Sequence, residues 1–301
     1  MNFEQKKDFE EIQKPLKELE EIISKTNLSD IKDITNTVAK ASGVYEKFPD
    51  SEKVANLYVS TLNTLAKRQF GLVDVMTTTA KIHSIYEKFP ESEDIAIQYV
   101  RMLSILSLNQ ESLADATATV AKASDICEKF PESENVATEY VHTLSTLVIR
   151  QNRVDETATV AKASDICEKF PESENVATEY LHILSTLVIR QDRVDATATV
   201  AKIHGIYEKF PESEDIAMEY VRILRILSLI YDSLADVTAT VAIVSDIYEK
   251  FPKSEDVAYT YVFILSTLAR IQASQADVTA TVAKASDIYE KFPKSEAVAY
   301  V

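Results

Sequence analysis

Apolar residues recur along this chain at three- and four-residue spacing, in paired stripes separated by a short break. In the stretch from Asp115 to Gln151 the two stripes comprise Val120, Ala123, Ile126, Cys127 and Phe130, and then Val136, Ala137, Tyr140, Val141, Leu144, Leu147 and Val148. Residues so spaced share one face of an α-helix. The pattern therefore predicts one helix from Ala116 to about Phe130 and a second helix after Ser133.

Start and stop signals frame both predicted helices. Asp115 and Ser133 are residue types that cap helix N-termini through a side-chain oxygen, and Pro131 stops the first helix because the residue before proline avoids helical angles. The tight Phe-Pro-Glu-Ser connection predicts antiparallel neighbours of about 15–19 residues each. Sixteen residues before each repeated proline the chain carries Asp33, Asp74, Asp115, Asp155, Asp195, Asp236 and Asp277, which predicts the same cap in every unit.

The paired stripes belong to a long repeat. Glu-Lys-Phe-Pro occurs seven times, ending at Pro49, Pro90, Pro131, Pro171, Pro211, Pro252 and Pro293, with gaps of 41, 41, 40, 40, 41 and 41 residues. Self-similarity at a period of 20 to 50 residues is typical of a solenoid. One helical hairpin cannot bury its apolar faces alone, so the units are expected to stack. The sequence predicts an all-α solenoid over residues 31–301, of about seven repeats.

The spacing of the core positions resembles that of tetratricopeptide repeats. Ala137, Tyr140, Val141 and Leu144 match the first helix of that family, and Thr119, Ala123, Ile126 and Pro131 match its second helix. The resemblance covers roughly residues 15–301. Residue types differ from those of the family, since the chain has no Trp and Val141 stands where the family often has glycine. The period of the repeat also exceeds the 34 residues of the family. The resemblance implies a right-handed superhelix of stacked antiparallel hairpins whose concave groove holds a peptide or partner protein.

The two ends differ from the repeat. Residues 1–30 carry a stripe of apolar residues amid dense charge, which predicts an N-terminal helical cap with one polar face. Pro15 is expected to start a helix or to kink one. At the other end Val301 falls early in a helix that runs on in the other units, so we expect a truncated last repeat and a fragment of a longer array.

Composition narrows the class of function. The net charge is −16, which argues against neutralising the phosphates of nucleic acid and against docking on anionic membranes. No apolar run is long enough to span a bilayer, and the N-terminus lacks a secretory signal, so a cytoplasmic protein is expected. Cys127 and Cys167 replace the tyrosine of other units and are expected to be reduced, packed thiols.

Catalytic chemistry finds little support in the sequence. Three scattered glycines cannot form a phosphate-cradling loop. The histidines, at positions 83, 142, 182 and 204, do not combine with the cysteines at a zinc-ligand spacing. The carboxylates fit helix starts and solvated faces. We therefore expect no enzyme activity, no metal and no cofactor in this segment.

Differences between repeats indicate where a partner could bind. Residues 121–160 and 161–200 match at 36 of 40 positions, which suggests a recent duplication. Against that background, positions 7, 11 and 14 after the proline vary and are expected to face away from the core. Position 11 holds Ser60, Arg101, His142, His182, Arg222 and Phe263, position 7 includes Tyr259, and position 14 holds Asn63, Ser104, Ser145, Ser185, Arg225 and Ser266.

These positions predict a ligand of a particular kind. Arg101, His142, His182, Arg222 and Arg225 would form a basic ladder that binds an acidic segment or a C-terminal carboxylate, since Arg captures carboxylates with two hydrogen bonds. Tyr259, Phe263 and Tyr300 would form an aromatic patch for an apolar anchor.

Several readings of these residues stay open. Drifted surface residues without any ligand would give the same pattern. The leading hypothesis is a protein-interaction scaffold or adaptor. The alternatives are an acidic decoy of a nucleic-acid-binding protein, and the sensor or regulatory arm of a larger effector that continues past residue 301.

Overall fold

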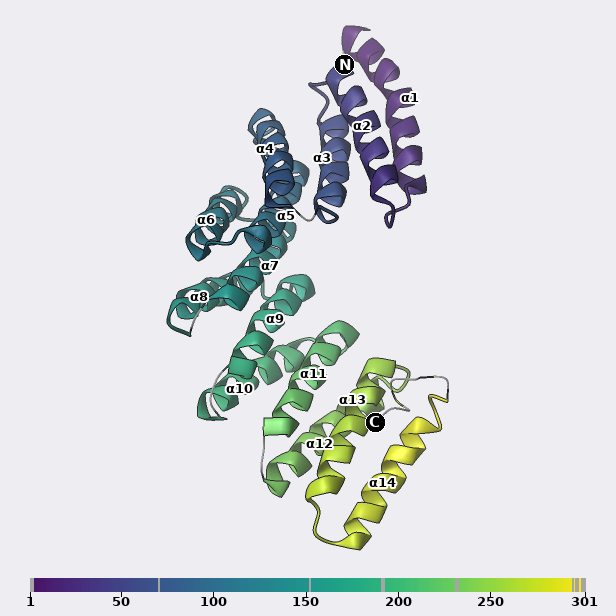
Figure 1. Cartoon of the computed structure of the whole chain (residues 1–301), viewed down its shortest axis with the longest axis vertical. Coiled ribbons are helices and arrows are strands. Elements are labelled where there is room, and N and C mark those ends of the chain that lie inside the picture. Colours follow the sequence, from purple (N-terminus) through teal and green to yellow (C-terminus); the bar gives the residue numbers. More distant parts are fainter. Residues whose placement is uncertain are drawn as a thin grey trace. The chain divides into compact units, whose positions relative to one another are not determined.

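The computed structural model describes residues 3–69, 71–151, 153–190, 193–230, 233–293, 295 and 298. Over these residues the protein contains fourteen α-helices and no strand, which confirms the prediction of an all-α helical repeat (Figure 1). The chain divides into two compact units, residues 1–166 and 167–301, with the boundary inside one helix. Each unit is described by itself.

The first unit contains seven complete helices and most of an eighth. They are α1 (Phe3–Lys25), α2 (Ile31–Lys47), α3 (Glu52–Ala66), α4 (Leu72–Lys88), α5 (Glu93–Asn109), α6 (Leu113–Lys129), α7 (Glu134–Arg150) and α8 (Arg153–Lys169). Successive helices from α1 to α7 contact each other, and α3, α5 and α7 also contact in series. From α1 to α7, each helix therefore packs on its neighbour in sequence, and the second helices α3, α5 and α7 also pack on one another in order.

The second unit has the same arrangement. It contains α9 (Glu174–Arg190), α10 (Arg193–Lys209), α11 (Glu214–Ile230), α12 (Leu234–Lys250), α13 (Glu255–Ile271) and α14 (Gln275–Tyr289). Successive helices contact each other, and α9, α11 and α13 contact in series. In Figure 1 these three second helices lie side by side, in shades from teal-green to yellow-green.

The core is built from the predicted stripes. In α7, the residues Val136, Ala137, Tyr140, Val141 and Leu144 are all buried, and the equivalent positions of the other second helices are buried too. The tyrosine of each second helix packs against an aromatic ring of the preceding first helix in four repeats. The ring pairs are Tyr45–Tyr58, Tyr86–Tyr99, Tyr207–Tyr220 and Tyr248–Tyr261, with centroids 5.2 to 5.6 Å apart.

A repeated hydrogen bond joins consecutive repeats at the Phe-Pro-x-Ser turn. The hydroxyl of Ser133 accepts from the backbone N–H of Val136 at 3.1 Å, which confirms the predicted cap, and donates to Oε1 of Glu93 in the preceding second helix at 2.6 Å. Ser92 donates to Glu52 in the same way. One serine therefore both caps its own helix and binds the second helix of the preceding repeat.

The predicted cap of the first helices is wrong by one turn. α6 begins at Leu113, where Ser112 is the N-cap and accepts from the N–H of Asp115 at 3.4 Å. Asp115 and its equivalents therefore lie within the first turn, where the helix dipole favours a carboxylate. The aspartates signal a helix start correctly, but earlier serine or aspartate residues cap α2 and α6.

The N-terminal residues form one helix. Pro15 lies inside α1, so of the two alternatives expected for it, that it starts a helix is excluded. Leu16 and Leu19 of α1 are buried, and α1 contacts α2 and α3. The buried side of the described part of α1 therefore packs on the first repeat, while the exposed residues between positions 12 and 25 are polar.

Candidate partner-binding face

The second helices α9, α11 and α13 share one partly exposed face. Between the buried core positions of each helix, the side chains at positions 7 and 11 after the proline are half-buried or exposed. We call this surface the second-helix face. In the second unit it consists of Thr178, His182, Met218, Arg222, Tyr259 and Phe263, together with Glu179 and Glu219 at position 8. The sequence prediction that positions 7 and 11 avoid the core is confirmed.

Position 14 departs from the prediction. Asn63, Ser104, Ser145 and Ser185 are buried. The helices of Asn63, Ser104 and Ser185 each contact the second helix of the next repeat within the same unit. The amide nitrogen of Asn63, for example, donates to the backbone oxygen of Gln98 in α5 at 2.9 Å. Arg225 and Ser266 are the half-buried exceptions among the six residues at this position.

In the first unit, Arg101 is held by a carboxylate of the next repeat. Its Nε donates to Oε1 of Glu139 at 3.0 Å, and its Nη2 donates to the same oxygen. The Glu139 side chain is mostly buried. Arg101 therefore links α5 to α7 within the chain. His142, the next predicted basic residue, is half-buried on α7.

In the second unit, His182 lies between two carboxylates. Its Nδ1 lies 3.4 Å from Oε2 of Glu179 on the same helix, and its Nε2 lies 3.5 Å from Oε1 of Glu219 on α11. These two partners, Glu179 first, outweigh desolvation and raise the pKa of His182 to about 9. The imidazole is therefore a cation at neutral pH.

Arg222 completes this charge cluster. Its Nη2 lies 2.9 Å from Oε2 of Glu219 and forms an ion pair with it. Two carboxylates thus face two cations, and the cluster is neutral overall. Arg101, His182 and Arg222, three members of the predicted basic ladder, each lie beside a glutamate of the chain itself, which balances their charge. The ladder as a binding surface stays a prediction.

Arg225 is placed differently. Its guanidinium carbon lies 5.3 Å from the ring centroid of Tyr259 and 5.5 Å from that of Phe263, both on α13. The two rings are 6.5 Å apart. Among the described residues, no carboxylate forms an ion pair with Arg225. These three residues, which we call the Arg225 cluster, unite a cation and two aromatic rings on adjacent helices. Tyr300, the third predicted aromatic residue, lies outside the described residues.

Sequence reasoning missed the glutamates that organise this face. Glu139, Glu179 and Glu219 stand at position 8, three residues before His142, His182 and Arg222. Residues at i and i+3 are neighbours on a helix, so the 40-residue recurrence of this acidic–basic pair was the available signal. The prediction considered each basic residue without the carboxylates around it.

The described residues give little support for a metal site, a reactive thiol or a membrane-spanning helix. No group of three or more His, Cys, Asp or Glu residues is placed to hold a metal ion in the described part of the chain. Cys127 and Cys167 are half-buried, and burial raises the pKa of the Cys167 thiol, which disfavours a reactive thiolate. None of the helices described here has the length and apolar character needed to cross a membrane.

Comparisons with known proteins leave the family unassigned. No protein-family model matches this sequence, and no curated protein sequence matches it significantly.

The raised pKa of His182 predicts a dependence of stability on pH. Because the folded-state pKa is about 9 and an unfolded histidine titrates near 6.5, the protonated form stabilises the fold fully below about pH 6.5. This contribution is lost as pH rises through 9. We expect His182→Gln to lower the urea midpoint at pH 6.5 and to have a smaller effect at pH 10.

Urea titrations at four pH values between 6 and 10 check this result. His83→Gln is the matched control, since the carboxylate beside His83 belongs to its own helix and no neighbouring repeat is involved. Parallel pH profiles for wild type and His182→Gln would contradict the assignment.

Proposed function

We propose that this chain is a protein-interaction scaffold built as a tetratricopeptide-like solenoid. In this proposal the hairpins stack into a right-handed superhelix, and the second-helix face lines a concave groove that binds a peptide or partner protein. The serial contacts of the second helices within each unit support this arrangement. The repeated serine–glutamate bonds between consecutive second helices support it as well.

The Arg225 cluster carries the proposal. Arg, Tyr and Phe are enriched in protein interfaces, and Arg and Tyr are among the residue types that contribute most to binding energy. Packing against two rings restricts the guanidinium, so less side-chain entropy is lost when it binds. Because no described carboxylate pairs with Arg225, it retains the capacity to bind one from a ligand.

These features define the ligand that fits best. A carboxylate, from an acidic side chain or a C-terminus, would pair with Arg225, and an adjacent apolar side chain would pack against Tyr259 and Phe263. His182 and Arg222 would contribute less to an acidic ligand, because it would have to compete with Glu219 for them. The binding site is therefore proposed to be centred on α11 and α13.

A quantitative pull-down from the source lysate tests this function. Wild type is compared with Arg225→Glu, and Arg270→Glu serves as the matched control, because Arg270 is an exposed arginine near the end of α13. We expect specific partners to bind wild type and Arg270→Glu and to be lost from Arg225→Glu. Equal recovery by all three proteins, each shown to be folded by circular dichroism, would refute the proposed site.

A further inference from the structure

A recurring ion pair joins the Phe-Pro turns of consecutive repeats in both units. The lysine before each Phe-Pro reaches back to the acidic residue that follows the proline of the preceding repeat. The distances between Nζ and the carboxylate oxygen are 2.8 Å for Lys88–Asp50, 3.0 Å for Lys129–Glu91 and 3.9 Å for Lys209–Glu172. Opposite charges therefore link neighbouring turns along one edge of each unit.

An aromatic ring of the preceding repeat also contacts this lysine. The Nζ of Lys129 lies 6.0 Å from the ring centroid of Tyr86, a tyrosine of the preceding first helix. Lys250 lies over Tyr207 in the same way, with its Nζ 5.8 Å from the centroid. A cation over the face of a ring is attracted by it. The ring and the carboxylate together therefore hold the ammonium group at the turn.

The turn after α14 departs from this pattern. Lys291 retains the ring contact, because its Nζ lies 5.3 Å from the ring centroid of Tyr248. The position that Glu91 occupies for Lys129, however, is here Lys253. Both Lys253 and Lys291 are exposed, and within the described part of the chain no carboxylate forms an ion pair with either. The residue that faces the lysine has thus changed from an anion to a cation.

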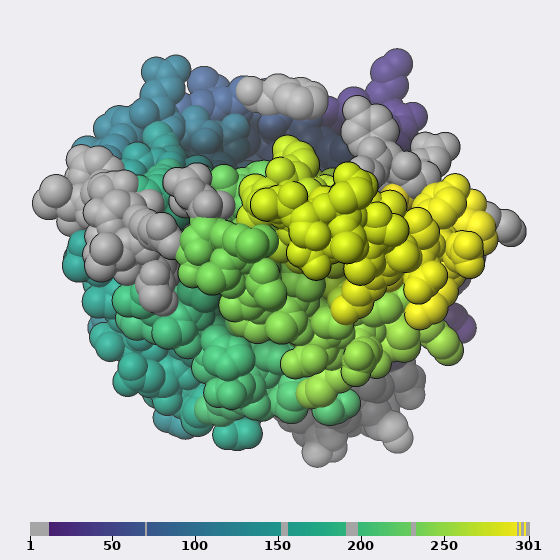
Figure 2. All heavy atoms as spheres, turned by 90° about the horizontal axis from the view of Figure 1, so that it is seen from below, coloured from purple at the N-terminus to yellow at the C-terminus, as the bar shows by residue number. Residues whose placement is uncertain are grey.

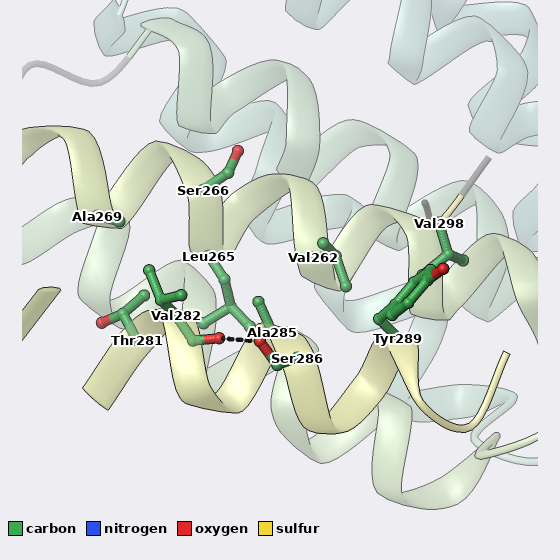
Figure 3. A pocket seen from close by; sticks show the side chains of 10 residues that line it. All are labelled: Val262, Leu265, Ser266, Ala269, Thr281, Val282, Ala285, Ser286, Tyr289 and Val298. Atoms are coloured by element: carbon green, nitrogen blue, oxygen red, sulfur yellow. Dashed lines mark hydrogen bonds between the residues drawn. The ribbon is translucent and has the colours of Figure 1, made fainter. Parts of the chain in front are cut away.

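Lys253 and Lys291, which we call the turn-lysine pair, lie outside the apolar hollow between α13 and α14. That hollow is lined by residues such as Tyr289 and Val298, and neither lysine belongs to its lining (Figure 3). Since the equivalent residues of earlier repeats contact each other directly, no further helix comes between the two positions. In the space-filling view α14, in yellow, lies at the surface of its unit (Figure 2).

The turn-lysine pair offers a place for a carboxylate. Two like charges on one turn edge disfavour each other, and an anion between them removes that cost. A carboxylate bound there makes the contact that Glu91 makes with Lys129. The Tyr248 ring restricts Lys291 before binding, so less side-chain freedom is lost when the ligand arrives. The pair therefore corresponds to an ion pair of the repeat in which the anion comes from outside the chain.

Charge also indicates what kind of molecule supplies the anion. The chain has a net charge of −16, so two copies repel each other. The turn carboxylates of Asp50 and Glu91 are already paired with lysines of their own chain. A single surface ion pair contributes little to binding, so a ligand with several adjacent carboxylates fits best.

We infer that the turn-lysine pair is a docking site for an acidic segment of a separate protein, a run of Asp or Glu residues. One carboxylate of that segment binds between Lys253 and Lys291. This site uses none of the residues of the Arg225 cluster, so it adds a second interaction surface to the proposed second-helix face.

Fluorescence anisotropy of a labelled hexaglutamate peptide, titrated with the whole chain at low ionic strength, tests the inference. A hexaglutamine peptide controls for charge. Lys253→Glu restores the acidic residue of the earlier repeats and so fills the site from within the chain. Lys202→Glu, at an exposed lysine of α10, is the matched charge reversal. Glu91→Lys, added to Lys253→Glu, builds the same lysine pair beside Lys129 and Tyr86.

We expect saturable binding of hexaglutamate that Lys253→Glu weakens at least tenfold, Lys202→Glu leaves unchanged and added Glu91→Lys restores. Binding should weaken as salt rises, because the site is exposed. The inference is overturned if hexaglutamate does not bind, if it binds no better than hexaglutamine, or if Lys253→Glu binds it as wild type does. Failure of Glu91→Lys to restore binding also overturns it. So does self-association in sedimentation that Lys253→Glu abolishes, because a second copy then supplies the anion.

Discussion

Replacing Tyr220 with alanine is expected to destabilise the second unit by about 3–5 kcal/mol, the range for removing a large aromatic side chain from a core. Tyr220 is 1% exposed. Its ring lies 5.4 Å from that of Tyr207 and 5.8 Å from that of His204, and its hydroxyl lies 3.2 Å from Nδ1 of His204. The substitution removes all these contacts from between α10 and α11.

Urea unfolding followed by far-ultraviolet circular dichroism measures this loss. Tyr220→Phe separates the ring from the hydroxyl and should cost about 1 kcal/mol, the net value of one hydrogen bond. Tyr289→Ala removes an exposed tyrosine of the first helix α14, at the position equivalent to Tyr207, and should have a much smaller effect. A Tyr220→Ala protein as stable as Tyr289→Ala would contradict the packing described between these helices.

Arg101→Glu carries the second largest expected effect, a loss of roughly 1.5–3 kcal/mol, which is the range for hydrogen bonds to charged groups. The substitution removes the bonds to Glu139 and sets a second carboxylate against a mostly buried one. Repulsion between like charges adds to the loss. The effect should appear as a lower urea midpoint of the first unit.

A double variant that exchanges the two charges tests whether the contact between positions 101 and 139 itself stabilises the fold, or whether any substitution at position 101 destabilises it. Arg101→Glu combined with Glu139→Arg restores opposite charges on α5 and α7, and should recover more than half of the lost stability. Lys53→Glu, an exposed charge reversal on α3, is the control and should change little. Simple addition of the two single losses in the double variant would show that the pair contributes nothing.

Local structure could be predicted from the sequence because the same helix start and stop signals recur in seven repeats. The apolar stripes and the proline predict pairs of helices of about 15–19 residues each, and Ser133 is the cap that the sequence predicts. The cap of α6 was misplaced because aspartate is favourable both as a cap and within the first turn. Ser112, three residues earlier, had the better geometry, and only the backbone distinguishes the two.

The site was harder to predict because it depends on contacts between repeats. The sequence pattern predicts that position 14 faces away from the core, yet Asn63 and Ser104 are buried, and their helices contact the next second helix. The pairing of Arg101 with Glu139 joins residues 38 positions apart, so its strength could not be read from either helix alone. The acidic-decoy and sensor-arm hypotheses stay predictions based on charge and on the end of the printed sequence.

Site-specific photo-cross-linking tests the central claim most directly. Benzoylphenylalanine replaces Phe263 in the Arg225 cluster, or Glu249, an exposed residue of α12, and the protein is irradiated in the source lysate. We predict a discrete cross-linked partner from position 263 that is absent from position 249 and is reduced when Arg225→Glu is added. Adducts that are equal at both positions, or insensitive to Arg225→Glu, would contradict the claim that this face binds a partner.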